Sequence, residues 1–220
     1  RFISATVSAG LADGKTIGQG LEEMDKIASE TLDDTFRTAL SGDSKDYRES
    51  SSSLMFAFIL ALVLIYLILA AQFESFKDPF IIMLTVPLAI AGALIFMFAG
   101  GITMNIFSQI GIIMLIGLVA KNGILIVEFA NLKQESGEDK MAAIRNAALQ
   151  RLRPILMTSV STILGLIPLA FATGEGANQR IAMGTAVVGG MLVSTLLTMY
   201  IVPAIYTYIS TNRKVKTETV

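Results

Sequence analysis

Five long runs of apolar residues constrain this chain more than any other feature of its sequence. A helix rises about 1.5 Å per residue, so about 20 apolar residues cross the roughly 30 Å hydrocarbon core of a bilayer. With a mean hydropathy of +0.65 and 16% charged residues, the chain is too apolar for an ordinary water-soluble domain. We therefore predict an α-helical polytopic membrane protein with five transmembrane helices. The expected spans are residues 54–71, 80–99, 106–132, 155–173 and 181–209.

Basic residues alternate between the polar segments that separate these spans. Short loops rich in Lys and Arg stay in the cytoplasm. The first connection, the third connection and the C-terminal tail together hold nine Lys and Arg residues, whereas the second and fourth connections hold only Arg180. This alternation predicts that residues 1 to about 50 lie outside the cell membrane and that the tail, residues 211–220, lies in the cytoplasm.

The segment before the first span, residues 1–45, has the pattern of a short α/β piece. Apolar and polar residues alternate in FISATVSA (2–9) and again in TFRTAL (35–40), as in half-buried strands. Between them, Thr16 and Gln19 have the spacing of a capping box that starts a helix. About 40 residues bury too little core to fold alone, so we expect this piece to complete a larger α/β domain.

Composition excludes several classes of function. The chain has no cysteine and no histidine, which excludes disulfides, zinc sites, thiol nucleophiles and histidine-dependent catalytic triads. The net charge of −1 gives no sign of a nucleic-acid partner. No enzyme activity and no cofactor are expected. The chain starts at Arg1, and we expect it to be part of a longer protein.

Lys121 is the charge that an apolar span does not explain. It lies near the middle of the third span, in GLVAKNGILIVEFAN (117–131), at a depth from which its ammonium group does not easily reach water. Such a residue normally faces the interior of a helix bundle and a partner, although a neutral lysine that only packs is the alternative. Since the expected spans hold no other acidic residue than Glu128, the partner is expected from beyond this chain.

Glu128 shares the face of Lys121 because it follows two helical turns later. Two turns separate the side chains by about 10 Å, which is too far for a direct ion pair. Glu128 is therefore either a solvated charge at the cytoplasmic boundary or a functional group.

The last two spans carry stripes of small and polar residues. In the fourth, Pro154 is expected in the first helical turn, and Arg151, Thr158, Ser161 and Gly165 share one face, either to bridge water for a proton or to allow close packing. In the fifth, small residues at every fourth position predict close helix packing. These residues are Ala186, Gly190, Ser194 and Thr198.

Long stretches of the chain resemble one family of transporters. GLVAKNGILIVEFAN, RLRPILMTSVSTILGLIPLAF (151–171) and VVGGMLVSTLLTMYIVPAIY (187–206) are similar to the C-terminal membrane portion of resistance-nodulation-division (RND) multidrug efflux pumps, in the hydrophobe/amphiphile branch. The resemblance covers about residues 1–210. It implies that residues 1–45 are the C-terminal piece of a periplasmic porter subdomain and that residues 46–210 are a transmembrane region.

The resemblance also implies roles for individual residues. Lys121 matches an intramembrane lysine that pairs with two aspartates in the N-terminal half of these pumps, and Thr158 and Arg151 match the threonine and arginine of the same proton relay. Asn122 and Glu128 are accessory candidates. The implied protein is a homotrimer of the bacterial inner membrane that works with a periplasmic adaptor and an outer-membrane channel, uses the proton as its coupling ion, and exports hydrophobic or amphiphilic compounds.

Two other interpretations remain. Another transporter of the RND superfamily, for lipids or as an accessory to protein export, would have the same spans. A membrane scaffold that transports nothing would also fit the spans, but it would leave Lys121 without a purpose. A hydrolase within the membrane is disfavoured, because the spans contain no histidine and no pair of carboxylates to activate water.

Overall fold

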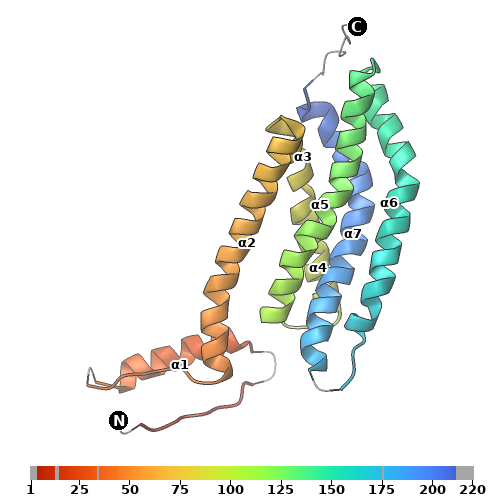
Figure 1. Ribbon diagram of the computed structural model, residues 1–220. Coiled ribbons are helices and arrows are strands. Elements are labelled where there is room, and N and C mark those ends of the chain that lie inside the picture. The colour runs from red at the N-terminus through yellow and green to blue at the C-terminus, as the bar shows by residue number, and fades with distance from the viewer. Residues whose placement is uncertain (1–3, 13–14, 34, 175, 212–220) are drawn as a thin grey trace. The chain divides into compact units, whose positions relative to one another are not determined.

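The computed structural model describes residues 4–12, 15–33, 35–174 and 176–211. The chain divides into two compact units, residues 1–55 and 56–220, and each is described here by itself. Most of the described residues form helices (Figure 1). The helices are α1 (Ile17–Thr31), α2 (Asp43–Phe73), α3 (Lys77–Met83), α4 (Thr85–Ala99), α5 (Ile106–Glu135), α6 (Lys140–Ala170) and α7 (Ala177–Ile209).

In the first unit, α1 begins with the predicted capping box. The Thr16 hydroxyl accepts a hydrogen bond from the Gln19 backbone N–H, and the Gln19 side chain accepts one from the Thr16 N–H, both at 3.3 Å. These two bonds satisfy backbone donors that the first turn of a helix cannot pair. An ion pair between Asp25 of α1 and Arg48 of α2 joins the two helices of this unit.

The two predicted strands are absent from the described residues, so the prediction of an α/β piece was wrong there. Residues 4–12 and 36–40 have no regular secondary structure, while residues 2 and 3 lie outside the described part. A strand is stabilised by backbone hydrogen bonds to a neighbouring strand. Among the described residues neither segment forms a ladder of backbone hydrogen bonds with another strand, and alternation alone does not make a sheet.

The prediction of five helices long and apolar enough to cross a membrane is confirmed for the described part of the chain. The segments long and apolar enough to cross a bilayer are Ser53–Phe73, Lys77–Ala99, Ile106–Glu135, Lys140–Ala170 and Ala177–Ile209. Within the second unit, α7 packs against α4, α5 and α6 and so forms the centre of the bundle (Figure 1).

Two apolar clusters fill the space around α7. One includes Ile81, Ile126, Ile155 and Val202, from α3, α5, α6 and α7. The other is formed by residues of α4, α5, α6 and α7, and Leu115 is fully buried in it. In contrast, only 6% of the most apolar part of Ser53–Phe73 is buried. That span therefore offers its surface to lipid or to other protein.

The fourth span starts much earlier than the sequence predicted. The connection between α5 and α6 is only the segment 136–139, and Asp139 caps α6 by accepting a hydrogen bond from the Met141 N–H at 3.2 Å. Pro154 is therefore inside α6 rather than in its first turn. The charges of residues 140–153 hid a helix whose apolar residues, Ala143, Ile144 and Ala147, recur on one face and are buried.

The second span is broken at Leu84, between α3 and α4. Pro87 explains the break, because a proline has no N–H to donate to the carbonyl four residues earlier and its ring collides with that carbonyl. The carbonyl in question belongs to Met83, the last residue of α3. The break lets one span contact α7 with two short helices.

Close helix crossings depend on glycines. A Cβ atom at Gly184 of α7 would lie 2.6 Å from the Ala170 backbone nitrogen and 2.7 Å from the Leu169 carbonyl carbon, and backbone atoms cannot turn away. A Cβ at Gly190 would lie 2.9 Å from the Ala89 carbonyl oxygen. By contrast, a Cβ at Gly165 of α6 would meet nothing within 4 Å.

We predict that Gly184→Ala destabilises the protein by about 1–3 kcal/mol, because the added methyl group overpacks the contact between α6 and α7. The measurement is the thermal unfolding midpoint of the protein in detergent. Gly165→Ala is the matched control, and it should leave the midpoint unchanged or raise it, because alanine favours a helix over glycine by about 1 kcal/mol. Equal midpoints for the two variants would contradict the crossing described here.

Candidate functional site

Lys121 lies on a face of α5 that the other described helices leave uncovered. Its side chain is exposed, as are Gly117 before it and Glu128 after it, whereas Ala120 and Asn122 beside it are buried. Among the described residues no hydrogen bond or ion pair reaches the Lys121 side chain. The helix therefore directs this cation away from α6 and α7.

Arg151 and Thr158 of α6 do not contact Lys121 through any hydrogen bond within the described part of the chain. The Arg151 guanidinium carbon lies 4.4 Å from the centre of the Phe129 ring, which places a cation over an aromatic face of α5. Its Nε is buried and has no hydrogen-bond partner among the described residues. The Thr158 hydroxyl donates to the Ile155 carbonyl of its own helix at 3.1 Å, so its oxygen can still accept a bond from another donor.

A buried polar cluster lies directly beside Lys121, and sequence reasoning had found only one of its members. The Asn122 amide donates to the Ser159 hydroxyl at 3.3 Å and to the Thr195 hydroxyl at 3.4 Å. The Thr195 hydroxyl in turn donates to Ser159 at 3.2 Å. We call these residues the Asn122 triad. It joins α5, α6 and α7 through side chains that are 2–4% exposed.

A second buried network contains a carboxylate that sequence reasoning placed outside the spans. Asp78 of α3 is 3% exposed and lies within the segment Lys77–Ala99. The Asn131 amide donates to it at 3.0 Å and the Ser210 hydroxyl at 3.4 Å. The expectation that Glu128 is the only acidic residue in the spans was therefore wrong. The second span begins at Lys77, before its apolar run, and so includes Asp78.

Tyr206 of α7 extends this network. Its hydroxyl donates to the Asn131 side chain and accepts a hydrogen bond from the Gln134 amide at 2.8 Å. The Tyr206 side chain is fully buried, so each of these bonds is shielded from water. Since Asn131 follows Lys121 by ten residues, about 15 Å along the helix, Asp78 lies too far away to be the partner of Lys121.

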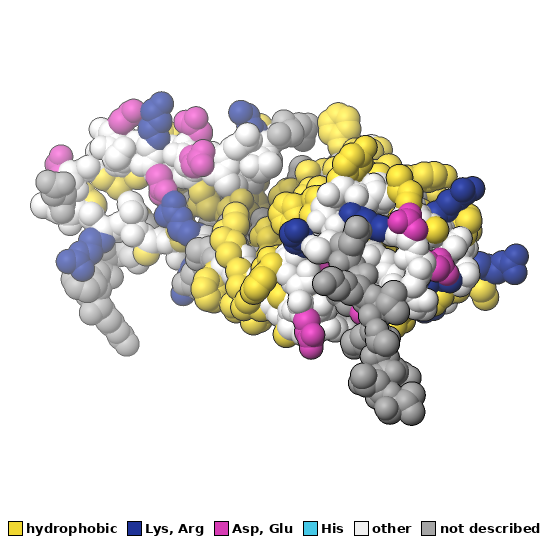
Figure 2. All heavy atoms as spheres, turned by 90° about the horizontal axis from the view of Figure 1, so that it is seen from above, with side chains coloured by type: hydrophobic (Ala, Val, Ile, Leu, Met, Phe, Trp, Pro, Cys, Tyr) yellow, Lys and Arg dark blue, Asp and Glu magenta, His cyan; other side chains and the backbone are white. Residues whose placement is uncertain are grey.

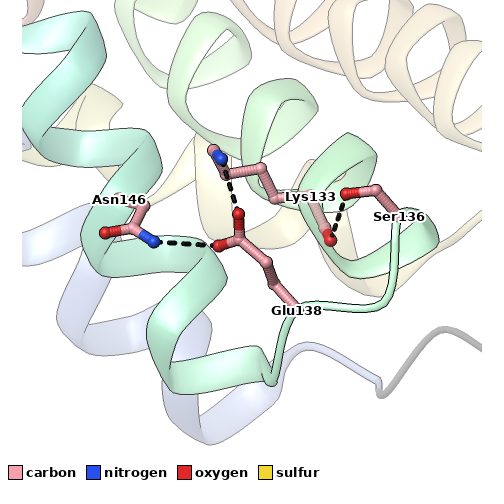
Figure 3. A network of polar contacts seen from close by, with 4 residues as sticks. All are labelled: Lys133, Ser136, Glu138 and Asn146. Atoms are coloured by element: carbon pink, nitrogen blue, oxygen red, sulfur yellow. Dashed lines mark hydrogen bonds and ion pairs between the residues drawn. The ribbon is translucent and has the colours of Figure 1, made fainter.

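Charged side chains gather at the end of the bundle where α5 ends and α6 begins. Figure 2 looks onto this end and shows basic and acidic side chains among apolar ones. In the connection, the Glu138 carboxylate accepts hydrogen bonds from Lys133 at 2.6 Å and from Asn146 at 2.9 Å (Figure 3). The bond from the Lys133 ammonium, followed by that from Asn146, lowers the pKa of Glu138 from its usual value.

The four small residues of α7 are all buried at helix contacts. They are Ala186, Gly190, Ser194 and Thr198. The Ser194 hydroxyl donates to the Met191 carbonyl of its own helix at 3.2 Å. The Thr198 hydroxyl oxygen is buried without a hydrogen-bond partner in the described structure.

Comparisons with known proteins agree over nearly the whole chain. Residues 1–210 match the model of the AcrB/AcrD/AcrF family. An uncharacterized transporter of Haemophilus influenzae is 38% identical over 96% of this chain and 21% of its own length. The toluene efflux pump membrane transporter TtgB of Pseudomonas putida is 39% identical over 90% of this chain and 19% of its own length. The multidrug resistance protein MdtF of Escherichia coli is 40% identical over 89% and 19%. The chain thus spans about a fifth of these relatives.

We predict that Tyr206→Phe destabilises the protein by about 1–3 kcal/mol, because it removes two buried hydrogen bonds, one to Asn131 and one from Gln134. Tyr208→Phe is the matched control, since Tyr208 is 89% exposed and should tolerate the loss of its hydroxyl. The measurement is the unfolding of each of the two variants in detergent. A Tyr206→Phe protein as stable as the control would show that the network contributes nothing.

We also predict that the connection between α5 and α6 loosens in acid. Because the folded-state pKa of Glu138 is lowered, its stabilising contribution is fully present above the ordinary pKa of a glutamate and is lost as the pH falls through the folded-state pKa. Amide hydrogen exchange at residues 136–139, corrected for intrinsic rates, should be faster in Glu138→Gln than in the wild type at pH 7. The difference between the two proteins should disappear as the pH falls below the folded-state pKa of Glu138. A difference that persists in acid would contradict the assignment.

Proposed function

The chain belongs to the AcrB/AcrD/AcrF family of RND efflux transporters, and we propose that the protein exports hydrophobic or amphiphilic compounds from bacteria in exchange for protons. The observation that carries the proposal is Lys121, a cation in the middle of a membrane-crossing helix on a face that the described helices leave uncovered. A charge at that depth is unfavourable unless it has a partner or a role. The relatives named for toluene and multidrug efflux support this class of substrate.

In the proposed mechanism, two aspartates of a preceding part of the transporter hold the Lys121 ammonium when they are ionised. Protonation of these acids removes the attraction, and the ammonium turns toward neutral acceptors such as the Thr158 hydroxyl oxygen. Arg151, held over Phe129, keeps a positive charge near the cytoplasmic end of the same path. Lys121, Thr158 and Arg151 are the proposed relay residues, and Glu128 is an accessory candidate.

The energy for the cycle comes from the proton gradient. Moving one charge across the membrane is worth about 2.3 kcal/mol per 100 mV, which is enough to shift a helix bundle between two arrangements of similar stability. The resulting movement of the helices would be transmitted through α2, which continues from the first span into the unit before it. No step of this cycle needs a cofactor.

We place the transporter in the bacterial inner membrane as a homotrimer, with a periplasmic adaptor and an outer-membrane channel as partners. The proposed orientation puts residues 1 to about 50 in the periplasm and the C-terminus in the cytoplasm. It is supported by the five basic residues from Lys133 to Arg153, which lie in the last turn of α5 and in the first half of α6. Arg180 is the basic residue near the connection between α6 and α7.

We predict that Lys121→Ala abolishes proton-driven export, with a loss of at least about tenfold, or 1.4 kcal/mol. The full-length transporter would be produced in cells that lack their own pumps, and export of a fluorescent amphiphile would be compared at equal amounts in the membrane. Lys77→Ala, which removes an exposed cation at the start of α3, is the control and should export normally. If the protein were a scaffold, Lys121→Leu would not change its activity. Export retained by either Lys121 variant would refute the proposed relay.

A further inference from the structure

The Asn122 triad is more polar than helix packing requires. Its three side chains are buried where α5, α6 and α7 meet, and the hydrogen bonds form a closed triangle of 3.2–3.4 Å. Apolar side chains of similar size would fill the same space. Hydrogen bonds differ from apolar contacts because they require particular directions, so they hold helices in one rotational setting.

That setting determines where Lys121 points. Successive side chains on an α-helix project about 100° apart, so a bond that fixes Asn122 toward α6 and α7 also fixes the direction of Lys121. The next residue, Gly123, packs closely against α3, because a Cβ atom at Gly123 would lie 3.2 Å from Ile82 Cγ2. A rotation of α5 about its own axis would have to break the triad or displace α3.

We infer that Asn122, Ser159 and Thr195 are positioning residues for Lys121. They hold the ammonium toward the uncovered face of α5, where an acid from another part of the transporter can reach it, and they connect any movement of α5 to α6 and α7. This inference rests on the proposed proton-coupled function. The hydroxyl groups of Ser159 and Thr195 are uncharged and do not contact Lys121. They would take part in the coupling only through their hydrogen bonds with Asn122.

Few ionisable groups surround Lys121 on the described helices. Glu128 shares its face of α5, and the charged residues of α6 all lie within residues 140–153, since residues 154–170 carry no charge. No Asp, Glu, Lys or Arg occurs in residues 181–209 of α7 or in residues 80–99 of α3 and α4. A change in the pH dependence of export caused by the triad would therefore report on Lys121 and its acidic partners.

The test uses the full-length transporter with Thr195→Val, Asn122→Leu and both together. Valine has the shape of threonine without its hydroxyl, so Thr195→Val removes the hydrogen bonds and keeps the packing. Thr195→Ser, which keeps a hydroxyl, should restore function. Ser194→Ala is the matched control, because Ser194 is equally buried but its hydroxyl bonds to its own helix.

At equal amounts in the membrane, Thr195→Val and Asn122→Leu should each lower export by about three- to fifteenfold, the range carried by hydrogen bonds between membrane helices. Both should shift the pH of half-maximal export by about half a unit or more, in the same direction. The double variant should export no less than the single variant with the lower export, because either substitution already disrupts the Asn122 triad. Ser194→Ala and Thr195→Ser should keep the wild-type rate and pH dependence.

Two results would overturn the inference while leaving the proposed function intact, provided that Lys121→Ala abolishes export. One is wild-type export by Thr195→Val and Asn122→Leu. The other is reduced export with an unchanged pH dependence and additive losses, which would mean that the triad only stabilises the fold. If Lys121→Ala itself exports normally, the proposed function fails, and the inference fails with it.

Discussion

A single ammonium group in the hydrocarbon of a bilayer is unfavourable by about 2.5–3.5 kcal/mol on insertion scales, and more on an isolated helix. Nearly every feature of the second unit bears on how this chain carries that charge at Lys121. The helix that holds it is buried along one side by α6 and α7 and bare along the other. The bare side contains the lysine, and the buried side contains the residues that keep the helix from turning.

Two kinds of contact define that arrangement. Glycines such as Gly184 and Gly190 have no Cβ atom, so the backbones of neighbouring helices can approach closely at these positions. This close approach sets the distances between the helices. The Asn122 triad and the network around Asp78 and Tyr206 add directional bonds at two levels along α5. Close packing alone would permit sliding and rotation, whereas hydrogen bonds at two levels restrict both.

Sequence reasoning predicted the five spans because a bilayer imposes a length and a polarity on any helix that crosses it. It missed the start of α6, since residues 140–153 are too charged to resemble a span, although their buried face has an ordinary helical period. The break at Leu84 is of the kind that Pro87, a proline within the second expected span, predicts. The predicted strands failed because a strand depends on a partner that alternation cannot supply.

The candidate site shows the same division. Lys121 stands out in sequence because its chemistry conflicts with its surroundings, and Asn122 was a candidate only as its neighbour. Ser159 and Thr195 could not be recognised, because they meet Asn122 across 37 and 73 residues and hydroxyl groups are common in membrane helices. Asp78 was missed for a different reason: it lies just before an apolar run, yet it is buried.

The most direct test of the account is a structure of the full-length transporter in a lipid nanodisc by cryo-electron microscopy, at a resolution that shows side chains. The account predicts that Lys121 Nζ lies within about 4 Å of a carboxylate oxygen contributed by another membrane-crossing helix. It would be contradicted if that nitrogen faced lipid, with no acidic side chain at its depth.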